Sequence, residues 1–299
     1  MSQRTLAGRS RDPRPVVERV RVGGVLVDRL TEQEVVDRVV VASLRGEGGH
    51  VVTPNVDICR MCARDPVVRS VVAQAEIAVP DGMPLVWASR LLGAAVPARI
   101  TGADLIWSLS EAAARAGLPI YLLGGPPGVA CRAAEVLRGR YAGLRVAGVA
   151  APPYGFEASA EAVREVRAAL VAAAPRLVFV GLGFPKQDRL IVTLREDLPG
   201  TWFVGCGAAI AFTAGAVRRA PEWMRRAGLE WLFRLAAEPT RLARRYLVDD
   251  LPFALRMLVC AAVTRAWRSH AVRASIRLMS AAVRLPGRAV TACREFMGR

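Results

Sequence analysis

The chain has 299 residues, of which 53% are hydrophobic and 23% charged, and its formal net charge is +16. This composition excludes a disordered polymer, and the length suits either one large domain with an appendage or two small domains. Lys186 is the single lysine, so the positive charge comes from arginine, whose forked guanidinium suits phosphate contacts. From residue 218 onward there are 17 basic and 6 acidic side chains. This imbalance predicts a polyanionic partner: a phosphate, nucleic acid or an anionic membrane.

The chain begins with residues 1–20, which are rich in arginine and proline and predict a flexible arm without the apolar stretch of an export signal. From residue 21 to residue 217, short apolar runs alternate with helical patterns, the first of which begins with Thr31 and Glu34 at capping-box spacing. Strands are expected at residues 21–27, 50–53, 76–79, 119–123, 144–149, 177–180 and 201–204. This alternation predicts an α/β fold with a mostly parallel, Rossmann-like sheet flanked by helices.

Arginine-rich helical patterns follow the last strand and predict a helical appendage over residues 218–255 and a basic tail over residues 256–299. The tail holds nine arginines and one acid, and each arginine near an anionic leaflet contributes about 1 kcal/mol. No apolar run reaches the ~18 residues that cross a bilayer. We therefore expect a cytoplasmic protein, peripherally associated with the inner face of the cell membrane. Nucleic acid is not expected, because the tail has two aromatic residues and no recognition motif.

Six cysteines lie mostly within apolar segments, which favours reduced thiols. Cys59 and Cys62 have the spacing of half a zinc site. No second pair follows, and the two histidines, His50 and His270, are distant in the sequence. Helix packing is therefore the favoured interpretation of these two cysteines, and neither a metal nor a cofactor is expected.

Polar residues follow several of the expected strands, where ligands of parallel sheets usually bind. Thr53 and Asn55 lie at the end of the strand at residues 50–53, and they either cap the next helix or donate to sugar hydroxyls or a phosphate. Asp81 follows the strand at residues 76–79 within Pro-Asp-Gly. This residue is either part of a turn or a base that takes the proton from a hydroxyl nucleophile.

Two glycine-containing loops follow later strands. Gly124 and Gly125 precede a helix and form either a phosphate cradle or a tight turn. The stretch departs from G-x-G-x-x-G, and the strand at residues 144–149 has no acid for a ribose, which disfavours a nicotinamide-dependent dehydrogenase. Lys186 and Gln187 lie in an irregular loop with two glycines and a proline, a kind of loop that often contacts ligands.

Eight arginines fall between residues 218 and 245, with only three glutamates among them. Converging guanidinium groups suit a diphosphate. The chain has no D-x-D motif to hold a divalent metal against nucleotide phosphates, so arginines are expected to stabilise a departing nucleotide diphosphate. The alternative is a non-catalytic basic adaptor that binds an anionic membrane or nucleic acid, but this function leaves Asp81 and Thr53 unexplained.

Several short motifs, taken together and in this order, resemble the WecG/TagA/CpsF family of bacterial glycosyltransferases over about residues 21–250. They are TPNVD at 53–57, PDG at 80–82, RITGAD at 99–104, YLLGG at 121–125, GLG and PKQ within 181–187, RAP at 219–221, and GLEW at 228–231 with the arginines that follow. The resemblance implies an inverting, metal-independent transfer of N-acetylmannosamine or a related hexose. The implied donor is a UDP-sugar, and the implied acceptor is linked to polyprenyl diphosphate.

The same resemblance implies roles for individual residues. Asp81 is the general base, Thr53 positions the sugar and Gln187 contacts the donor sugar. The appendage closes over the active site, and its arginines neutralise the UDP phosphates. These arginines are Arg234, Arg241 and Arg244. The other expected substrate-binding residues are Asn55, Thr101, Asp104, Gly124, Gly125 and Lys186.

The resemblance further implies biosynthesis of a cell-surface polysaccharide or a teichoic-acid-type polymer, without a cofactor. It also implies a homo-oligomer that membrane contact converts to an active monomer. The chain departs from the family pattern at two places. Asp188 stands where the family has a glutamate, and Ile210-Ala211 stands where the family often has Phe-Asp.

Overall fold

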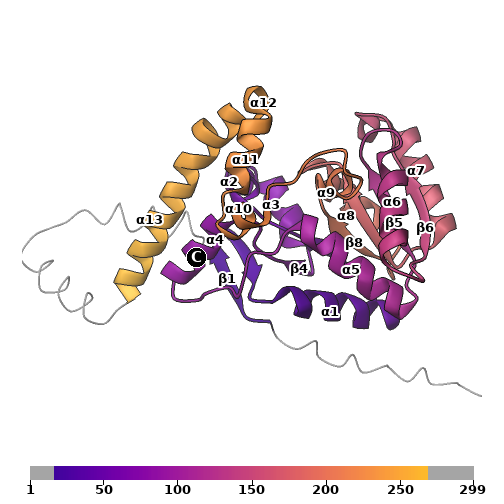
Figure 1. Cartoon of the computed structure of the whole chain (residues 1–299). Coiled ribbons are helices and arrows are strands. Elements are labelled where there is room, and N and C mark those ends of the chain that lie inside the picture. Colours follow the sequence, from indigo (N-terminus) through magenta and orange to yellow (C-terminus); the bar gives the residue numbers. More distant parts are fainter. Residues whose placement is uncertain (1–16, 269–299) are drawn as a thin grey trace, which may run out of the picture.

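The computed structural model describes residues 17–268 of the chain (Figure 1). Its centre is a six-stranded sheet in the order β4-β3-β8-β7-β5-β6, in which every neighbouring pair is parallel. The strands are β3 (Gly49–Val52), β4 (Ile77–Ala78), β5 (Ile120–Gly124), β6 (Val146–Ala150), β7 (Leu177–Gly181) and β8 (Trp202–Gly205). The predicted α/β fold with a parallel sheet is confirmed.

Helices cover both faces of this sheet, which explains why its strands are almost continuously apolar. One face packs against α1 (Glu32–Leu44), α5 (Gly102–Ala116), α6 (Val129–Arg140) and α9 (Ala209–Thr213). The other face packs against α2 (Val56–Arg64), α3 (Pro66–Ala73), α7 (Ala160–Ala173) and α8 (Lys186–Leu194). A short 3-10 helix, η1 (Phe156–Ala158), precedes α7. The predicted capping box between Thr31 and Glu34 is present at the start of α1.

The expected strand at residues 21–27 is wrong as a single strand. It is a hairpin of β1 (Arg19–Val22) and β2 (Val25–Asp28), which pair antiparallel in a separate sheet. Gly23 and Gly24 form the two-residue turn with φ angles of 57° and 85°, which glycine adopts without strain. β1 begins within the predicted N-terminal arm, and residues 1–16 of that arm lie outside the described residues.

The hairpin supports the strand that leads to Asp81. Asp28, at the end of β2, is buried, and its Oδ2 accepts a hydrogen bond from the N–H of Ala78 at 2.7 Å. Its other carboxylate oxygen accepts from Arg19 Nε at 2.6 Å. Because Ala78 ends β4, this contact fixes the position from which the chain continues to Asp81.

The arginine-rich region after the last strand is helical, as predicted. It consists of α10 (Glu222–Arg226), α11 (Glu230–Ala237), α12 (Pro239–Ala243), the π-helical η2 (Arg244–Asp250) and α13 (Leu251–Arg268). The last three elements follow one another without a break, and α13 packs against α4 (Met83–Leu91) (Figure 1). We call residues 218–268 the appendage.

The predicted boundary between residues 255 and 256 falls inside α13, so the beginning of the predicted tail is part of this helix. Met257, Cys260 and Ala261 are buried there among residues of the hairpin and α4. Residues 269–299 of the predicted tail lie outside the described residues. Among residues 17–268, no helix combines the length and the apolar character needed to cross a bilayer.

Candidate active site

Asp81 lies at the carboxyl edge of the sheet, where the segments after β3 and β4 meet. Its backbone N–H donates to the carbonyl of Pro54 at 2.8 Å, and the carbonyl of Pro80 accepts from the N–H of Ile100 at 2.9 Å. Thr53, the first residue after β3, is buried at this edge. The expected placement of Thr53 and Asp81 at the carboxyl ends of neighbouring strands is confirmed, while their roles stay predictions.

The side chain of Asp81 is 29% exposed. Its protonated, neutral form is nevertheless more favoured in the protein than it is for a free aspartate in water. Desolvation by the surrounding protein raises the pKa of Asp81 to about 7. Glu230 and Asp104 add to this rise, whereas Arg99 and Arg234 oppose it. Arg99 Nη1 lies 3.8 Å from Asp81 Oδ1. A carboxylate with a pKa near neutrality is suited to accept a proton at physiological pH.

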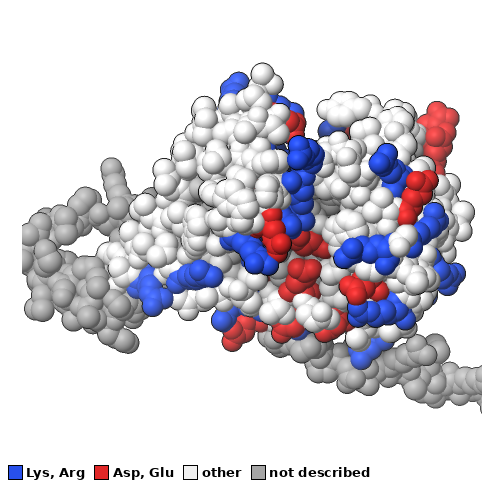
Figure 2. Space-filling view, in the orientation of Figure 1, with Lys and Arg blue, Asp and Glu red and all other residues white. Residues whose placement is uncertain are grey.

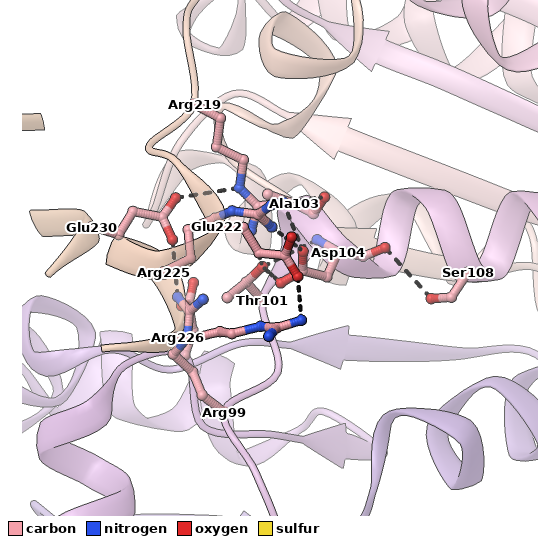
Figure 3. Close-up of polar contacts among 11 residues, drawn as sticks. Arg99, Thr101, Ala103, Asp104, Ser108, Arg219, Glu222, Arg225, Arg226 and Glu230 are labelled. Carbon is pink, nitrogen blue, oxygen red and sulfur yellow. Dashed lines mark hydrogen bonds and ion pairs between the residues drawn. The ribbon is translucent and has the colours of Figure 1, made fainter. Parts of the chain in front are cut away.

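The core and the appendage meet in a chain of alternating charges (Figure 3). One of its members, Arg99, lies next to Asp81. Arg99 Nη1 donates to Glu230 Oε2 at 3.0 Å, and Glu230 Oε1 accepts from Arg219 Nε at 3.4 Å. Arg219 also reaches the start of α5, because it donates to Asp104 Oδ1 at 2.7 Å and to Thr101 Oγ1 at 3.2 Å. Burial opposes ionisation of Asp104, but hydrogen bonds from Arg219 and Thr101 lower its pKa. Ionised side chains therefore hold the appendage against the site.

No role was predicted from the sequence for Arg99 or Glu230, and Arg219 was predicted only as one of the eight arginines that suit a diphosphate. All three lie in the motifs on which the family resemblance rests. The available signal was Glu230 itself. It is one of three glutamates among the eight arginines of residues 218–245. A glutamate surrounded by so many arginines is expected to form an ion pair with one of them. The sequence does not show that one of these partners, Arg99, comes from the other side of the site.

Three predicted substrate-binding residues have structural partners at helix starts. Thr101 caps α5, since its hydroxyl oxygen accepts from the N–H of Asp104 at 3.1 Å and its O–H group donates to Asp104 Oδ2 at 2.6 Å. Asn55 caps α2 by accepting from the N–H of Ile58 at 3.0 Å. Helix capping is therefore confirmed for Asn55, and it is not performed by Thr53. Contacts of Asn55, Thr101 and Asp104 with a substrate stay predictions.

Gly124 ends β5, Gly125 follows it, and the absence of a side chain at these positions permits close backbone packing. A Cβ atom at Gly124 would lie 2.6 Å from the carbonyl oxygen of Gly181 at the end of β7. Gly124 and Gly125 also have positive φ angles, of 117° and 83°. Both residues therefore form the tight turn between β5 and α6, and their contact with a phosphate stays a prediction.

Gln187 joins the loops that follow β7 and β8. Its carboxamide is buried, and Oε1 accepts from the N–H of Gly183 at 3.2 Å and from the N–H of Gly207 at 3.1 Å. Lys186 is partly exposed, and its ammonium group pairs with Glu157. The structure thus places Gln187 at the edge of the sheet and Lys186 in an ion pair on the surface. Contact of Gln187 with the donor sugar and of Lys186 with a substrate stay predictions.

Asp188, which stands where the family has a glutamate, contacts His50 in the structure. The sequence did not predict this contact. Asp188 and His50 are both fully buried, and His50 Nε2 lies 3.0 Å from Asp188 Oδ1. His50 belongs to β3 and Asp188 to the first turn of α8, next to Gln187. The Asp188 carboxylate is therefore turned into the protein, where it holds α8 against the sheet.

The three predicted phosphate-binding arginines of the appendage differ in position. Arg234 on α11 is close enough to Asp81 for its charge to lower the pKa of that carboxyl. Arg241 on α12 is exposed, and its Nε lies 2.6 Å from Glu238 Oε2. Arg244 is exposed at the beginning of η2. The structure therefore brings Arg234 to the site, whereas Arg241 and Arg244 lie on the surface of the appendage.

Cys59 and Cys62 belong to the apolar cluster formed by the hairpin, α2, α4 and α13. Both are buried, and burial raises the pKa of both thiols. They pack as small apolar side chains, in agreement with the favoured interpretation. Within residues 17–268, no three histidine, cysteine or acidic side chains come together as a metal site requires.

Comparison with known proteins identifies the chain as a glycosyltransferase. It belongs to the family of glycosyl transferases described as WecG/TagA/CpsF, whose model matches residues 20–267. One relative is the N-acetylglucosaminyldiphosphoundecaprenol N-acetyl-beta-D-mannosaminyltransferase of Bacillus spizizenii. It is 30% identical over 200 residues, which cover 67% of this chain and 76% of the relative. The resemblance found in the sequence is confirmed, and the alternative of a non-catalytic adaptor is set aside.

Proposed function

We propose that this enzyme transfers N-acetylmannosamine, or a related hexose, from a UDP donor to a polyprenyl-diphosphate-linked acceptor, with inversion and without a metal. The name of the Bacillus relative supports the sugar and the lipid-linked acceptor. The product would enter the synthesis of a cell-surface polysaccharide or a teichoic-acid-type polymer. The proposal rests on the position of the Asp81 carboxylate, which lies at the carboxyl edge of the sheet 3.8 Å from Arg99 Nη1 and whose pKa burial raises to about 7.

In the proposed reaction, Asp81 takes the proton of the acceptor hydroxyl while that oxygen forms a bond to the anomeric carbon of the donor. The bond between the anomeric carbon and the phosphate oxygen breaks on the opposite side, and UDP leaves with the electron pair. Attack opposite the leaving group inverts the anomeric configuration. The proton then passes from Asp81 to solvent, which a pKa of about 7 permits at physiological pH.

Guanidinium groups stabilise the charge that grows on the departing diphosphate. Arg99 and Arg234 already lie near Asp81. Arg241 forms an exposed ion pair with Glu238. Such pairs contribute roughly 0–1 kcal/mol, so a phosphate can replace the glutamate. We place the donor phosphates between Asp81 and the arginines of the appendage, with Thr53 and Gln187 on the sugar.

An exposed apolar ridge on α13 supports the proposed contact with a membrane. Leu251, Leu255 and Val259 follow at intervals of four residues, and roughly half of each residue is exposed. In Figure 2 the visible surface of the upper appendage carries few charges, whereas charged side chains gather where the appendage meets the core. Apolar ridges of this kind insert at the boundary of headgroups and acyl chains. We therefore place the enzyme on the cytoplasmic face of the membrane, where the lipid-linked acceptor is located.

A transfer assay on the full chain tests the proposal. The donors are UDP-N-acetylmannosamine, UDP-N-acetylglucosamine and UDP-glucose, and the acceptor is N-acetylglucosamine diphosphate on a short lipid. We expect transfer that persists in EDTA and gives an inverted anomer by NMR. The Asp81→Asn variant should still bind UDP in calorimetry but transfer about 100-fold more slowly or worse. Absence of transfer from any donor, or full activity of this variant, would refute the proposal.

A further inference from the structure

Glu230 lies on the appendage, yet it contacts an arginine of the core next to Asp81. We propose that Glu230 is a positioning residue for the transfer reaction: it holds the Arg99 guanidinium toward the appendage and thereby keeps Asp81 without a hydrogen-bonded cation. This inference rests on the proposed function, in which Asp81 is the base. When the appendage docks on the core, it therefore changes the proton affinity of Asp81 in addition to supplying arginines.

The distances around Arg99 show which of the two nearby carboxylates it is hydrogen-bonded to. The same nitrogen, Nη1, lies 3.0 Å from Glu230 Oε2 and 3.8 Å from Asp81 Oδ1. Only the first distance is that of a hydrogen bond. The side chains of Arg99 and Glu230 are 15% and 16% exposed, so water screens this pair only partly. Arg99 is therefore held by Glu230 and interacts with Asp81 only through space.

Glu230 is itself fixed from two sides. Its Oε2 accepts from Arg99, and its Oε1 accepts from Arg219 (Figure 3). Arg219 is in turn bound to Asp104 and Thr101 at the start of α5. Because both carboxylate oxygens of Glu230 have partners, it cannot follow Arg99 toward Asp81 without losing the contact to Arg219.

The charges that face Asp81 come from two places. Arg99 belongs to the segment that leads into α5 and Asp104 to the first turn of that helix, whereas Glu230 and Arg234 belong to α11. Removal of the negative charge at position 230 acts on Asp81 in two ways with the same sign. It removes a nearby negative charge, and it frees Arg99 to close the gap to Asp81. Both effects favour the carboxylate form and make Asp81 a weaker base.

The contrasting possibility is that Glu230 only fastens the appendage to the core. In that case its removal lowers stability or substrate affinity but leaves the proton affinity of Asp81 unchanged. The pH dependence of kcat/KM separates these cases, because this quantity reports the pKa values of essential groups in the free enzyme.

The experiment compares three variants of the full chain. In Glu230→Gln, which is isosteric, we expect the acidic limb of the kcat/KM profile to move about one pH unit lower. Glu230→Asp keeps the charge and should retain the wild-type profile. The matched control is Glu222→Gln, which removes the same charge from an exposed ion pair with Arg226 on α10 and should leave the profile unchanged. An unshifted profile in Glu230→Gln, or an equal shift in Glu222→Gln, would overturn the inference.

A second measurement does not require catalysis. Carbon-13 NMR follows the titration of the Asp81 carboxyl in the substrate-free protein, with Asp81→Asn identifying its signal. We expect this titration to move to lower pH in Glu230→Gln, and an unchanged titration midpoint contradicts the inference whatever the activity. If instead the midpoint moves while Asp81→Asn remains fully active, Glu230 still acts on Asp81, and it is the proposed role of Asp81 as the base that fails.

Discussion

Arg245 Nη2 in the appendage lies 2.6 Å from Asp57 Oδ2 in α2. This contact is part of a four-membered ion cluster. Arg60 pairs with Asp57 and lies 2.9 Å from Asp250 Oδ1, and Arg245 Nε lies 3.7 Å from Asp250 Oδ2. Two of the four residues come from α2 and two from η2. The cluster is a second attachment of the appendage to the core, separate from the chain of charges around Glu230.

Arg245→Ala should loosen the appendage, because it removes one cation from a cluster whose Asp57 side chain is only 5% exposed. We expect the free energy of unfolding to fall by about 2 kcal/mol. Hydrogen exchange should become faster in α11–α13 but not in the central sheet. The control is Arg226→Ala, which removes an arginine from an exposed pair on α10 and should change stability by less than about 0.5 kcal/mol. Equal stability losses in the two variants would contradict this prediction.

The pH dependence of transfer follows from the raised pKa of Asp81. The base must be ionised, and its pKa in the free enzyme is about 7. We therefore expect kcat/KM to be constant at high pH and to fall about tenfold per pH unit below pH 7. Steady-state rates between pH 5.5 and pH 9 provide the measurement. Full activity down to pH 5.5 would show that no group with this pKa acts as the base.

Arg241→Ala tests whether exposed arginines of the appendage bind the donor. We expect UDP affinity to fall about tenfold in calorimetry, the loss of one charge-assisted contact to phosphate. Arg226→Ala again serves as the control, since both arginines are exposed and paired with a glutamate on their own helix or next to it. A similar loss of UDP affinity in both variants would show that the loss comes from the lower net charge of the protein and that Arg241 does not contact the donor.

Leu255→Glu tests the apolar ridge on α13. Because about half of Leu255 is exposed, a charge there should leave the fold intact but weaken binding to anionic vesicles about tenfold. Val171→Glu is the control: Val171 is also about half exposed, but it lies on α7, far from the appendage (Figure 1). Co-sedimentation with vesicles of phosphatidylglycerol and phosphatidylcholine measures the difference. If Leu255→Glu binds as well as Val171→Glu, the ridge does not contact the membrane.

Local patterns in the sequence determined most of the fold. Apolar runs gave the six parallel strands, and the spacing of Thr31 and Glu34 gave a helix start, because both depend on neighbours along the chain. The position of Asp81 at the sheet edge followed from the same reasoning, since parallel strands end on one side. The hairpin was missed because Gly23-Gly24 interrupts a run whose flanks have the same apolar character.

The partners of the polar residues depend on how distant parts of the chain pack together. Arg99 meets Glu230 across 131 residues, and His50 meets Asp188 across 138. No local pattern specifies such pairs. They form because the packing of helices and strands brings side chains of opposite charge together from distant parts of the chain. The sequence thus predicted that an acid and several arginines share one site, and the packing of the appendage on the core determined which arginine each acid contacts.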